Sequence, residues 1–129
     1  MSVVGRHVYG SLYECDVQRL SDRDYLERLV AQAVEESNNT LVDIHSWEFP
    51  AGDTGLKGVS VIALVLESHI AVHTWTEHAY ATVDVYTCGE RSNPLRGFMV
   101  IAEGLRARHV EYHVVDRSLK SHAPHPRER

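Results

Sequence analysis

The chain has 129 residues, 43% of them hydrophobic, and a formal net charge of -5 from 13 Lys and Arg against 18 Asp and Glu. This length fits one domain with a modest hydrophobic core. The basic residues form no block, which argues against nucleic-acid binding, and no apolar run approaches the roughly 18 residues that a membrane-spanning helix needs.

Two cysteines, Cys15 and Cys88, are too few for a disulfide framework, and the chain does not open with a basic segment followed by an apolar one. We therefore expect a cytoplasmic protein with free thiols and no secretory signal. His69 and His73 have the four-residue spacing of zinc ligands on a helix. They lie in strand-like sequence, however, where that spacing separates them by roughly 13 Å, so we expect no metal site.

The first predicted elements are a strand and a helix. Val3 to Leu12 contains apolar and aromatic residues without helical spacing, which indicates a strand. A helix is predicted from Ser21, whose side chain would cap it, with Asp24 in the capping-box position. One apolar stripe follows with helical spacing, and Asn38 and Asn39 end the helix; the stripe is Leu26, Leu29, Val30, Ala33 and Val34.

The middle of the chain predicts four strands. Thr40 to Phe49 alternates in part, and the segment from Pro50 to Gly58 is a loop because it is rich in glycine. Val59 to Leu66 is short and rich in β-branched residues, as a buried central strand is. Two further strands are predicted over Ile70 to Trp75 and Ala81 to Thr87.

A second helix is predicted to open at Asn93 and Pro94, since proline is tolerated in the first turn. Its stripe is Phe98, Ile101, Ala102 and Leu105. A last strand covers His109 to Val115. We expect residues 1–116 to form one domain and residues 117–129 to form a mobile tail.

This order, βαββββαβ, predicts an α/β fold of the α+β type, a two-layer α-β sandwich. The sheet would be mainly antiparallel, with both helices on one face. Its other face would then need a cover, and a second copy of the chain is the simplest one.

A polar cluster interrupts the central strands, because Glu67, Ser68 and His69 follow an apolar run directly. Buried polar groups without partners cost roughly 1–3 kcal/mol each, so either the chain leaves the core here or the cluster has a chemical role. Taken singly, the other candidates have ordinary structural readings as local, surface or core residues: Ser60, Glu77, Cys15, Cys88, Trp47, Phe49 and Trp75. The flat faces of the aromatic ones could instead stack on a ligand ring.

The combination is more specific than its parts. "KGVS" precedes Ser68, "ESHIAVHTW" surrounds it, Glu77 follows, and "DVYTCG" ends at Gly89. Together with "GRHVYGSLYECD" near the start and the "NP" of the second helix, this pattern resembles the small prokaryotic S-adenosylmethionine decarboxylases. The resemblance runs from Gly5 to about Asp116.

The resemblance implies that the chain cleaves itself between Glu67 and Ser68, giving a piece of residues 1–67 and a piece that begins at 68. The Ser68 hydroxyl would attack the Glu67 carbonyl, and elimination would then leave a pyruvoyl group at position 68. His73 matches the family histidine that assists the elimination, and Ser60 matches the serine that positions the processing site.

In the same family the pyruvoyl ketone binds the substrate amine and accepts electrons as carbon dioxide leaves. Cys88 matches the family's proton donor in that reaction. No metal and no external cofactor would be required. The family's active site forms between two copies, so the resemblance also implies a homodimer of cleaved protomers.

The resemblance implies S-adenosylmethionine as the substrate, with Glu77 on the ribose hydroxyls and Phe49 stacked on the adenine. Thr76 stands where the family most often has proline, and the loop from Pro50 to Lys57 is long. "HVYGSLY" and "SVIALVLESHI" are similar to an archaeal branch that decarboxylates arginine, with ornithine decarboxylases as relatives. Arginine is therefore the alternative substrate. The alternative of another class is a non-catalytic small-molecule or metal-binding domain that has kept the fold.

Overall fold

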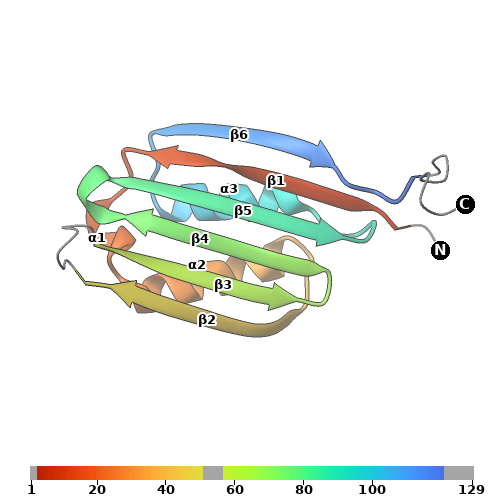
Figure 1. Cartoon of the computed structure of the whole chain (residues 1–129), viewed down its shortest axis with the longest axis horizontal. Coiled ribbons are helices and arrows are strands. Elements are labelled where there is room, and N and C mark those ends of the chain that lie inside the picture. The colour runs from red at the N-terminus through yellow and green to blue at the C-terminus, as the bar shows by residue number, and fades with distance from the viewer. Residues whose placement is uncertain (1–2, 51–56, 121–129) are drawn as a thin grey trace, which may run out of the picture.

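A computed structural model describes residues 3–50 and 57–120 of the chain. Six strands form one antiparallel sheet in the order β2-β3-β4-β5-β1-β6 (Figure 1). The strands are β1 (Gly5–Tyr13), β2 (Leu41–Phe49), β3 (Gly58–Val65), β4 (Ser68–Trp75), β5 (Tyr80–Cys88) and β6 (His109–Asp116). The helices are α1 (Val17–Leu20), α2 (Arg23–Glu36) and α3 (Pro94–Gly104), with a 3-10 turn, η1 (Thr76–His78).

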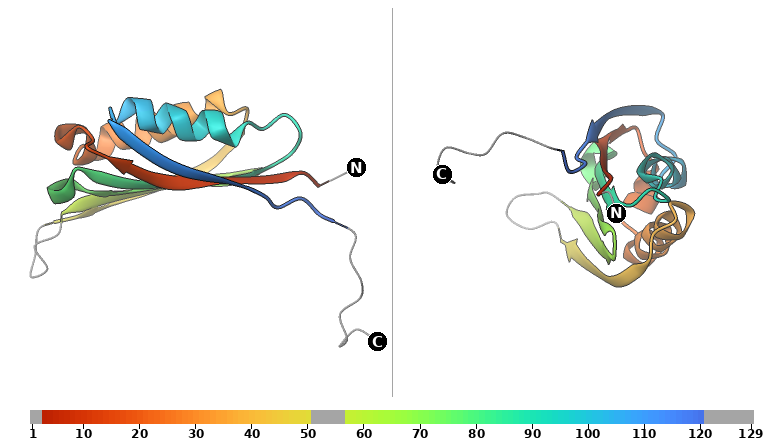
Figure 2. Two further views of the ribbon diagram at one scale, coloured as in Figure 1. Left: turned by 90° about the horizontal axis from the view of Figure 1, so that it is seen from above. Right: turned by 90° about the vertical axis from the view of Figure 1, so that its right-hand side faces the viewer.

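The core lies between the sheet and the two longer helices, which occupy the same face (Figure 2). Side chains of β3, β4 and β5 alternate, and the buried member of each pair points to the helices. The predicted stripe of α2 is buried, and α3 buries Phe98, Ile101 and Ala102. Each large apolar side chain buried in this way contributes roughly 1.5–3 kcal/mol. The predicted two-layer α+β sandwich is confirmed.

Among the boundaries that differ from the prediction are the starts of α2 and β4. The cap of α2 is Asp22, whose side chain accepts the Tyr25 N–H, while Ser21 ends the short helix α1. Helix α1 was not predicted, because four residues are too few to show helical periodicity. Strand β4 begins at Ser68 rather than Ile70, since Ser68 pairs with both neighbouring strands.

The end of the fold also differs from the predicted boundary at residue 117. The backbone N–H groups of Arg117 and Leu119 donate to the carbonyls of Gly5 and Val3, at 2.7 and 3.0 Å. The Arg117 guanidinium lies 4.2 Å from the centre of the Tyr86 ring. The chain therefore stays beside β1 beyond β6, and residues 121–129 of the predicted tail lie outside the described residues, as does most of the predicted loop before β3.

No element of the described chain covers the second face of the sheet (Figure 2). Ile62 and Leu64 of β3 alternate with buried residues and are half-exposed. Trp47 and Phe49 of β2 and Tyr9 of β1 are exposed as well. Within residues 3–50 and 57–120, no helix is long and apolar enough to cross a membrane.

Candidate active site

The turn between β3 and β4 carries the predicted cleavage point. Ser68 pairs with Val65 on β3 and with Thr87 on β5. Its φ angle is +154°, a backbone conformation that residues with a side chain rarely adopt. Such conformations cost about 1–3 kcal/mol and persist only where surrounding contacts enforce them. The backbone is therefore strained at the Glu67–Ser68 junction.

Hydrogen bonds hold the Glu67 side of this junction at both its carbonyl and its carboxylate. The Cys88 backbone N–H donates to the Glu67 carbonyl at 2.9 Å. The Thr40 backbone N–H donates to Glu67 Oε1 at 2.9 Å, and the Thr40 hydroxyl lies 3.5 Å from Oε2. The peptide bond that would be cut thus belongs to a residue whose carbonyl and side chain are both fixed.

The predicted proton donor lies beside this junction, because Cys88 directly follows the cross-strand partner of Ser68. The Cys88 thiol is partly exposed and donates to the Tyr86 hydroxyl over 3.8 Å. That contact is the main reason why the pKa of Tyr86 is raised, and burial adds to it. The sequence did not identify Tyr86 as a neighbour of the thiol, although residues two apart on a strand share a face.

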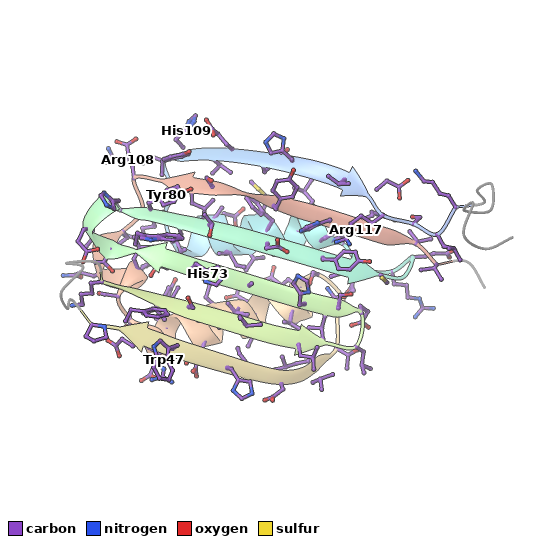
Figure 3. The ribbon with its side chains drawn as sticks, in the orientation of Figure 1. Trp47, His73, Tyr80, Arg108, His109 and Arg117 are labelled. Atoms are coloured by element: carbon purple, nitrogen blue, oxygen red, sulfur yellow. The ribbon has the colours of Figure 1, made fainter. Side chains whose placement is uncertain are left out.

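A second group of predicted residues lies elsewhere on the sheet. Ser60 and His73 are direct cross-strand partners, and the Ser60 Oγ to His73 Nδ1 distance is 2.7 Å. This Ser60–His73 pair lies on the uncovered face, where Figure 3 labels His73. It borders a pocket of about 370 Å³ that is also lined by Phe49, Pro50, Lys57, Gly58, Thr74 and Trp75.

Glu77 lies in η1, just after the strand that ends at Trp75. A hydrogen bond from the Lys57 backbone N–H, followed by one from its own N–H, lowers the pKa of its carboxyl group. The Thr76 N–H donates to the Lys57 carbonyl at 2.9 Å, a bond that proline at this position could not form. The Thr76 hydroxyl is buried and has no hydrogen-bond partner within the described ranges.

The two groups are far apart within one chain. Ser68 and His73 are five residues apart on β4. A strand rises about 3.3 Å per residue, so the two residues are separated by about 16 Å. One chain therefore brings Glu67, Ser68 and Cys88 together, and separately Ser60, His73 and Phe49, but it does not unite the two groups.

Comparisons with known proteins were made for both the sequence and the structure of the chain. Residues 6–118 match the family described as S-adenosylmethionine decarboxylase. The chain belongs to the S-adenosylmethionine decarboxylase family. The family predicted from the motifs around Ser68 is thereby confirmed, and with it the assignment to a family of decarboxylases.

Two relatives and one solved structure illustrate the place of the chain in this family. An arginine decarboxylase proenzyme of Ignicoccus hospitalis is 54% identical over 117 residues, which cover 90% of this chain and 78% of the relative. An S-adenosylmethionine decarboxylase proenzyme of Sulfolobus acidocaldarius is 48% identical over 116 residues, 90% of each chain. The crystal structure of the adenosylmethionine decarboxylase of Aquifex aeolicus aligns with a TM-score of 0.80 at 31% identity, covering 97% of this chain and 99% of that one.

A further polar cluster on the uncovered face was missed by the sequence analysis. Asp84 Oδ1 lies 2.9 Å from His7 Nε2 and 3.2 Å from His69 Nε2. Only the strand register brings these three residues together, although outward alternation on β4 and β5 would have placed His69 and Asp84 on one face. Within the described part of this family member, no group of three or more His, Cys, Asp or Glu residues could hold a metal ion.

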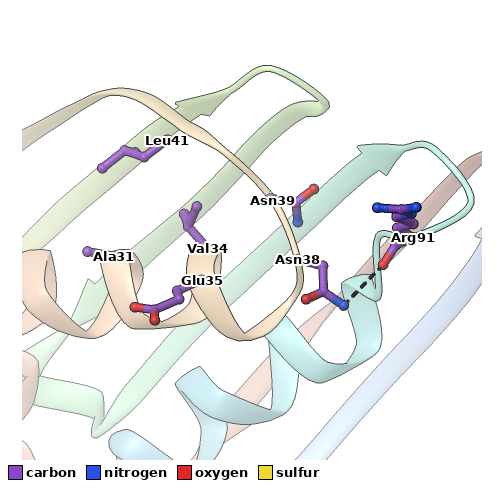
Figure 4. Close-up of a pocket in the computed structure, with 7 residues that line it drawn as sticks. All are labelled: Ala31, Val34, Glu35, Asn38, Asn39, Leu41 and Arg91. Atoms are coloured by element: carbon purple, nitrogen blue, oxygen red, sulfur yellow. Dashed lines mark hydrogen bonds between the residues drawn. The ribbon is translucent and has the colours of Figure 1, made fainter.

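A larger pocket lies away from all predicted site residues. It measures about 910 Å³ and lies at the C-terminal end of α2, where Asn38 Nδ2 donates to the Arg91 carbonyl (Figure 4). Its lining is Ala31, Val34, Glu35, Asn38, Asn39, Leu41 and Arg91, which includes no residue of the family's motifs. We therefore assign it no part in the family's reaction.

Proposed function

We propose that this protein is a self-processing, pyruvoyl-dependent decarboxylase that cuts its own backbone between Glu67 and Ser68. The observation that supports this most directly is the strained φ of +154° at Ser68, beside a Glu67 carbonyl that accepts the Cys88 N–H. The word "proenzyme" in the names of both relatives accords with a chain that matures by cleavage.

The proposed cleavage needs only groups of the chain and one water molecule. The Ser68 oxygen bonds to the Glu67 carbonyl carbon, the peptide C–N bond breaks, and the hydroxyl proton passes to the released nitrogen. Loss of the Ser68 α-proton then breaks the Cβ–Oγ bond. The group that leaves is the main-chain carboxylate of Glu67, which becomes the new C-terminus of residues 1–67. Water hydrolyses the remaining enamine, which releases ammonia and leaves a pyruvoyl group. Strain at the junction favours the first step because it raises the energy of the intact peptide.

The residues around position 68 fit such a group. The pyruvoyl group would supply an electron-accepting ketone for the decarboxylation. The Cys88 thiol lies on the neighbouring strand and can hold a proton next to the reacting atoms. Tyr86, as its hydrogen-bonding neighbour, keeps the thiol oriented on the uncovered face.

A homodimer completes the site in this proposal. The Ser60–His73 pair cannot reach Ser68 of its own chain across about 16 Å. A second copy packed on the uncovered face would bury the exposed Ile62, Leu64 and Tyr9 and could bring its own Ser60–His73 pair to this Ser68. His73 would then take the α-proton in the elimination, held in orientation by the Ser60 hydroxyl.

We propose S-adenosylmethionine as the substrate. The pocket beside the Ser60–His73 pair has aromatic walls, Phe49 and Trp75, that suit a purine ring. The lowered pKa keeps Glu77 ionised near neutral pH, as an acceptor for ribose hydroxyls. Arginine is the second candidate, because the 54% identical relative is named an arginine decarboxylase proenzyme and an ionised carboxylate also binds a guanidinium.

Mass spectrometry of the intact protein tests the proposal. Cleavage predicts a fragment of residues 1–67 and a second fragment whose first residue carries a ketone in place of an amine. Release of carbon dioxide from each substrate, tested separately, then identifies the reaction. An intact serine at position 68 in active protein would refute the proposal, as would a Ser68→Ala variant that still releases carbon dioxide.

A further inference from the structure

Thr40 lies next to the cleavage point although it is 27 residues earlier in the sequence. It directly precedes β2, and its backbone makes two contacts with the β3–β4 turn. Its carbonyl accepts the Leu66 N–H at 3.0 Å, and its N–H donates to Glu67 Oε1 at 2.9 Å. The segment before β2 is therefore tied to the two residues that precede Ser68.

We propose that the Glu67 side chain anchors the scissile peptide, with the Thr40 N–H as its fixed partner, and that self-cleavage depends on this anchor. The inference rests on the proposed function, since it assigns a positioning role within the same cleavage. Glu67 and Thr40 act here as positioning residues, because neither side chain takes part in bond making or bond breaking.

The anchor explains how the strained conformation is maintained. A φ of +154° at Ser68 relaxes unless both sides of the junction are held. On the Ser68 side, β4 is held between β3 and β5. On the Glu67 side, the Cys88 N–H holds the carbonyl and the Thr40 N–H holds the carboxylate. Without the second bond, the turn could rotate about Glu67 and move the carbonyl away from the Ser68 hydroxyl.

The anchor also directs negative charge away from the reaction. Attack on the Glu67 carbonyl places developing negative charge on its oxygen, where the Cys88 N–H can stabilise it. An unrestrained Glu67 carboxylate would repel that charge at close range. The Thr40 N–H draws the carboxylate toward the start of β2 and partly compensates its charge.

The test follows cleavage of the full chain, not activity. Chains are made by cell-free translation with labelled methionine, and the fraction cleaved is measured against time on a gel. The two methionines, Met1 and Met99, label both fragments. Glu67→Ala should slow cleavage about tenfold or more, because a hydrogen bond to a charged group is lost. Glu67→Gln should retain most of the rate, since its amide oxygen can still accept the Thr40 N–H.

Leu66→Ala is the matched control, because Leu66 lies in the same turn with its side chain 73% exposed. It should cleave at the wild-type rate. Thermal unfolding of each variant in a Ser68→Ala background separates a slow reaction from a damaged fold. If Glu67→Ala lowers the melting temperature strongly, Thr40→Pro removes the N–H donor while Glu67 stays in place, and it should slow cleavage too.

The outcomes distinguish the anchor from the cleavage itself. A wild-type chain that never cleaves overturns the proposed function. A wild-type chain that cleaves, beside a folded Glu67→Ala chain that cleaves equally fast, overturns the anchor alone. The anchor is also wrong if Glu67→Gln is as slow as Glu67→Ala, since the hydrogen bond would then not be the contact that matters.

Discussion

The Ser60 hydroxyl oxygen lies 2.7 Å from Nδ1 of His73, on adjacent strands of the uncovered face. In a neutral histidine the direction of this hydrogen bond decides which nitrogen carries the proton. With the Ser60 hydroxyl donating to Nδ1, Nε2 carries the proton; with the ring donating, Nε2 is free to act as a base. The pair is thus a preorganised unit, and what it acts on must lie within reach of the His73 ring.

Mixed dimers test whether the Ser60–His73 pair acts on Ser68 of a second copy of the chain. Ser68→Ala and His73→Ala are each expected to remain uncleaved as pure proteins. When the two differently tagged chains are coexpressed in equal amounts, about half of the His73→Ala chains should pair with a Ser68→Ala chain and be cleaved, because the partner supplies an intact Ser60–His73 pair. A gel that resolves the two tags measures this fraction.

Coexpression of His73→Ala with a double variant, Ser68→Ala/His73→Ala, is the control and should give no cleavage, because the partner then brings no intact Ser60–His73 pair. If the His73→Ala chain stays intact in mixed dimers whose formation is verified by pull-down, then the pair does not act across the interface.

Ser60→Ala should slow cleavage without preventing folding. Its side chain is partly buried, and its loss removes the hydrogen bond that orients His73. We expect cleavage to be slower by about tenfold to a hundredfold, within the range of a positioned acid–base group. The time course of fragment formation measures the effect. Cleavage at the wild-type rate would show that His73 needs no orientation by Ser60.

Glu77→Gln should weaken substrate binding and leave processing intact. Hydrogen bonds lower the pKa of the Glu77 carboxyl group below its ordinary value, so Glu77 is ionised throughout the range from about pH 6 to 8. Its contribution to substrate binding should therefore not vary over that range. We expect KM to rise by about tenfold or more, which corresponds to losing one charge-assisted contact. Steady-state kinetics on cleaved protein, with the fraction cleaved measured in parallel, separates the two effects; an unchanged KM would remove Glu77 from the substrate site.

Gly58→Ala should destabilise the fold at the edge of the pocket. A Cβ atom there would lie 1.9 Å from the Thr74 carbonyl oxygen, so two paired strands would have to separate. We expect a loss of about 1–3 kcal/mol, as for overpacking in a core. Gly89→Ala is the comparison, since its Cβ would meet nothing within 4 Å. The only cost of that substitution is the backbone strain of placing alanine at a φ of +104°. Thermal unfolding of both variants should show the larger loss for Gly58→Ala.

The helices and strands could be predicted because each carries a local pattern. The stripe of α2 has helical spacing and is buried as predicted. Strand β3 was recognised by its short run of β-branched residues, although Ile62 and Leu64 lie on the uncovered face and are not buried. Helix α1 could not be found in this way, because Asp16 caps only a single turn. The resemblance around Ser68 identified the family without any of this geometry.

Contacts between residues that are far apart in the sequence could not be predicted. The Thr40–Glu67 bond joins residues 27 apart, and the His7–Asp84 contact joins residues 77 apart. Both depend on strand register, which the periodicity of a single strand does not specify. The distance between Ser68 and His73 was hidden for another reason. The predicted strand began at Ile70, which left Ser68 in a turn of undefined geometry.

Cys15 makes the stability of the protein sensitive to alkaline pH. Its side chain is 6% exposed, and burial raises the pKa of its thiol from 9.0 to about 11. Below pH 9 the thiol is neutral in both the folded and the unfolded chain. Between pH 9 and 11 the unfolded chain ionises first, so the free energy of unfolding falls as pH rises, by up to about 1.4 kcal/mol for each pH unit.

Urea unfolding of the uncleaved Ser68→Ala chain at pH 8 and pH 10.5, with and without Cys15→Ala, measures this contribution. The two variants differ only at Cys15, so titration of the other groups cancels in the comparison. We expect the chain with Cys15 to lose about 1–2 kcal/mol more between the two pH values than the Cys15→Ala chain. Equal losses would mean that the thiol ionises as readily in the folded chain as in the unfolded one, so that burial does not raise its pKa.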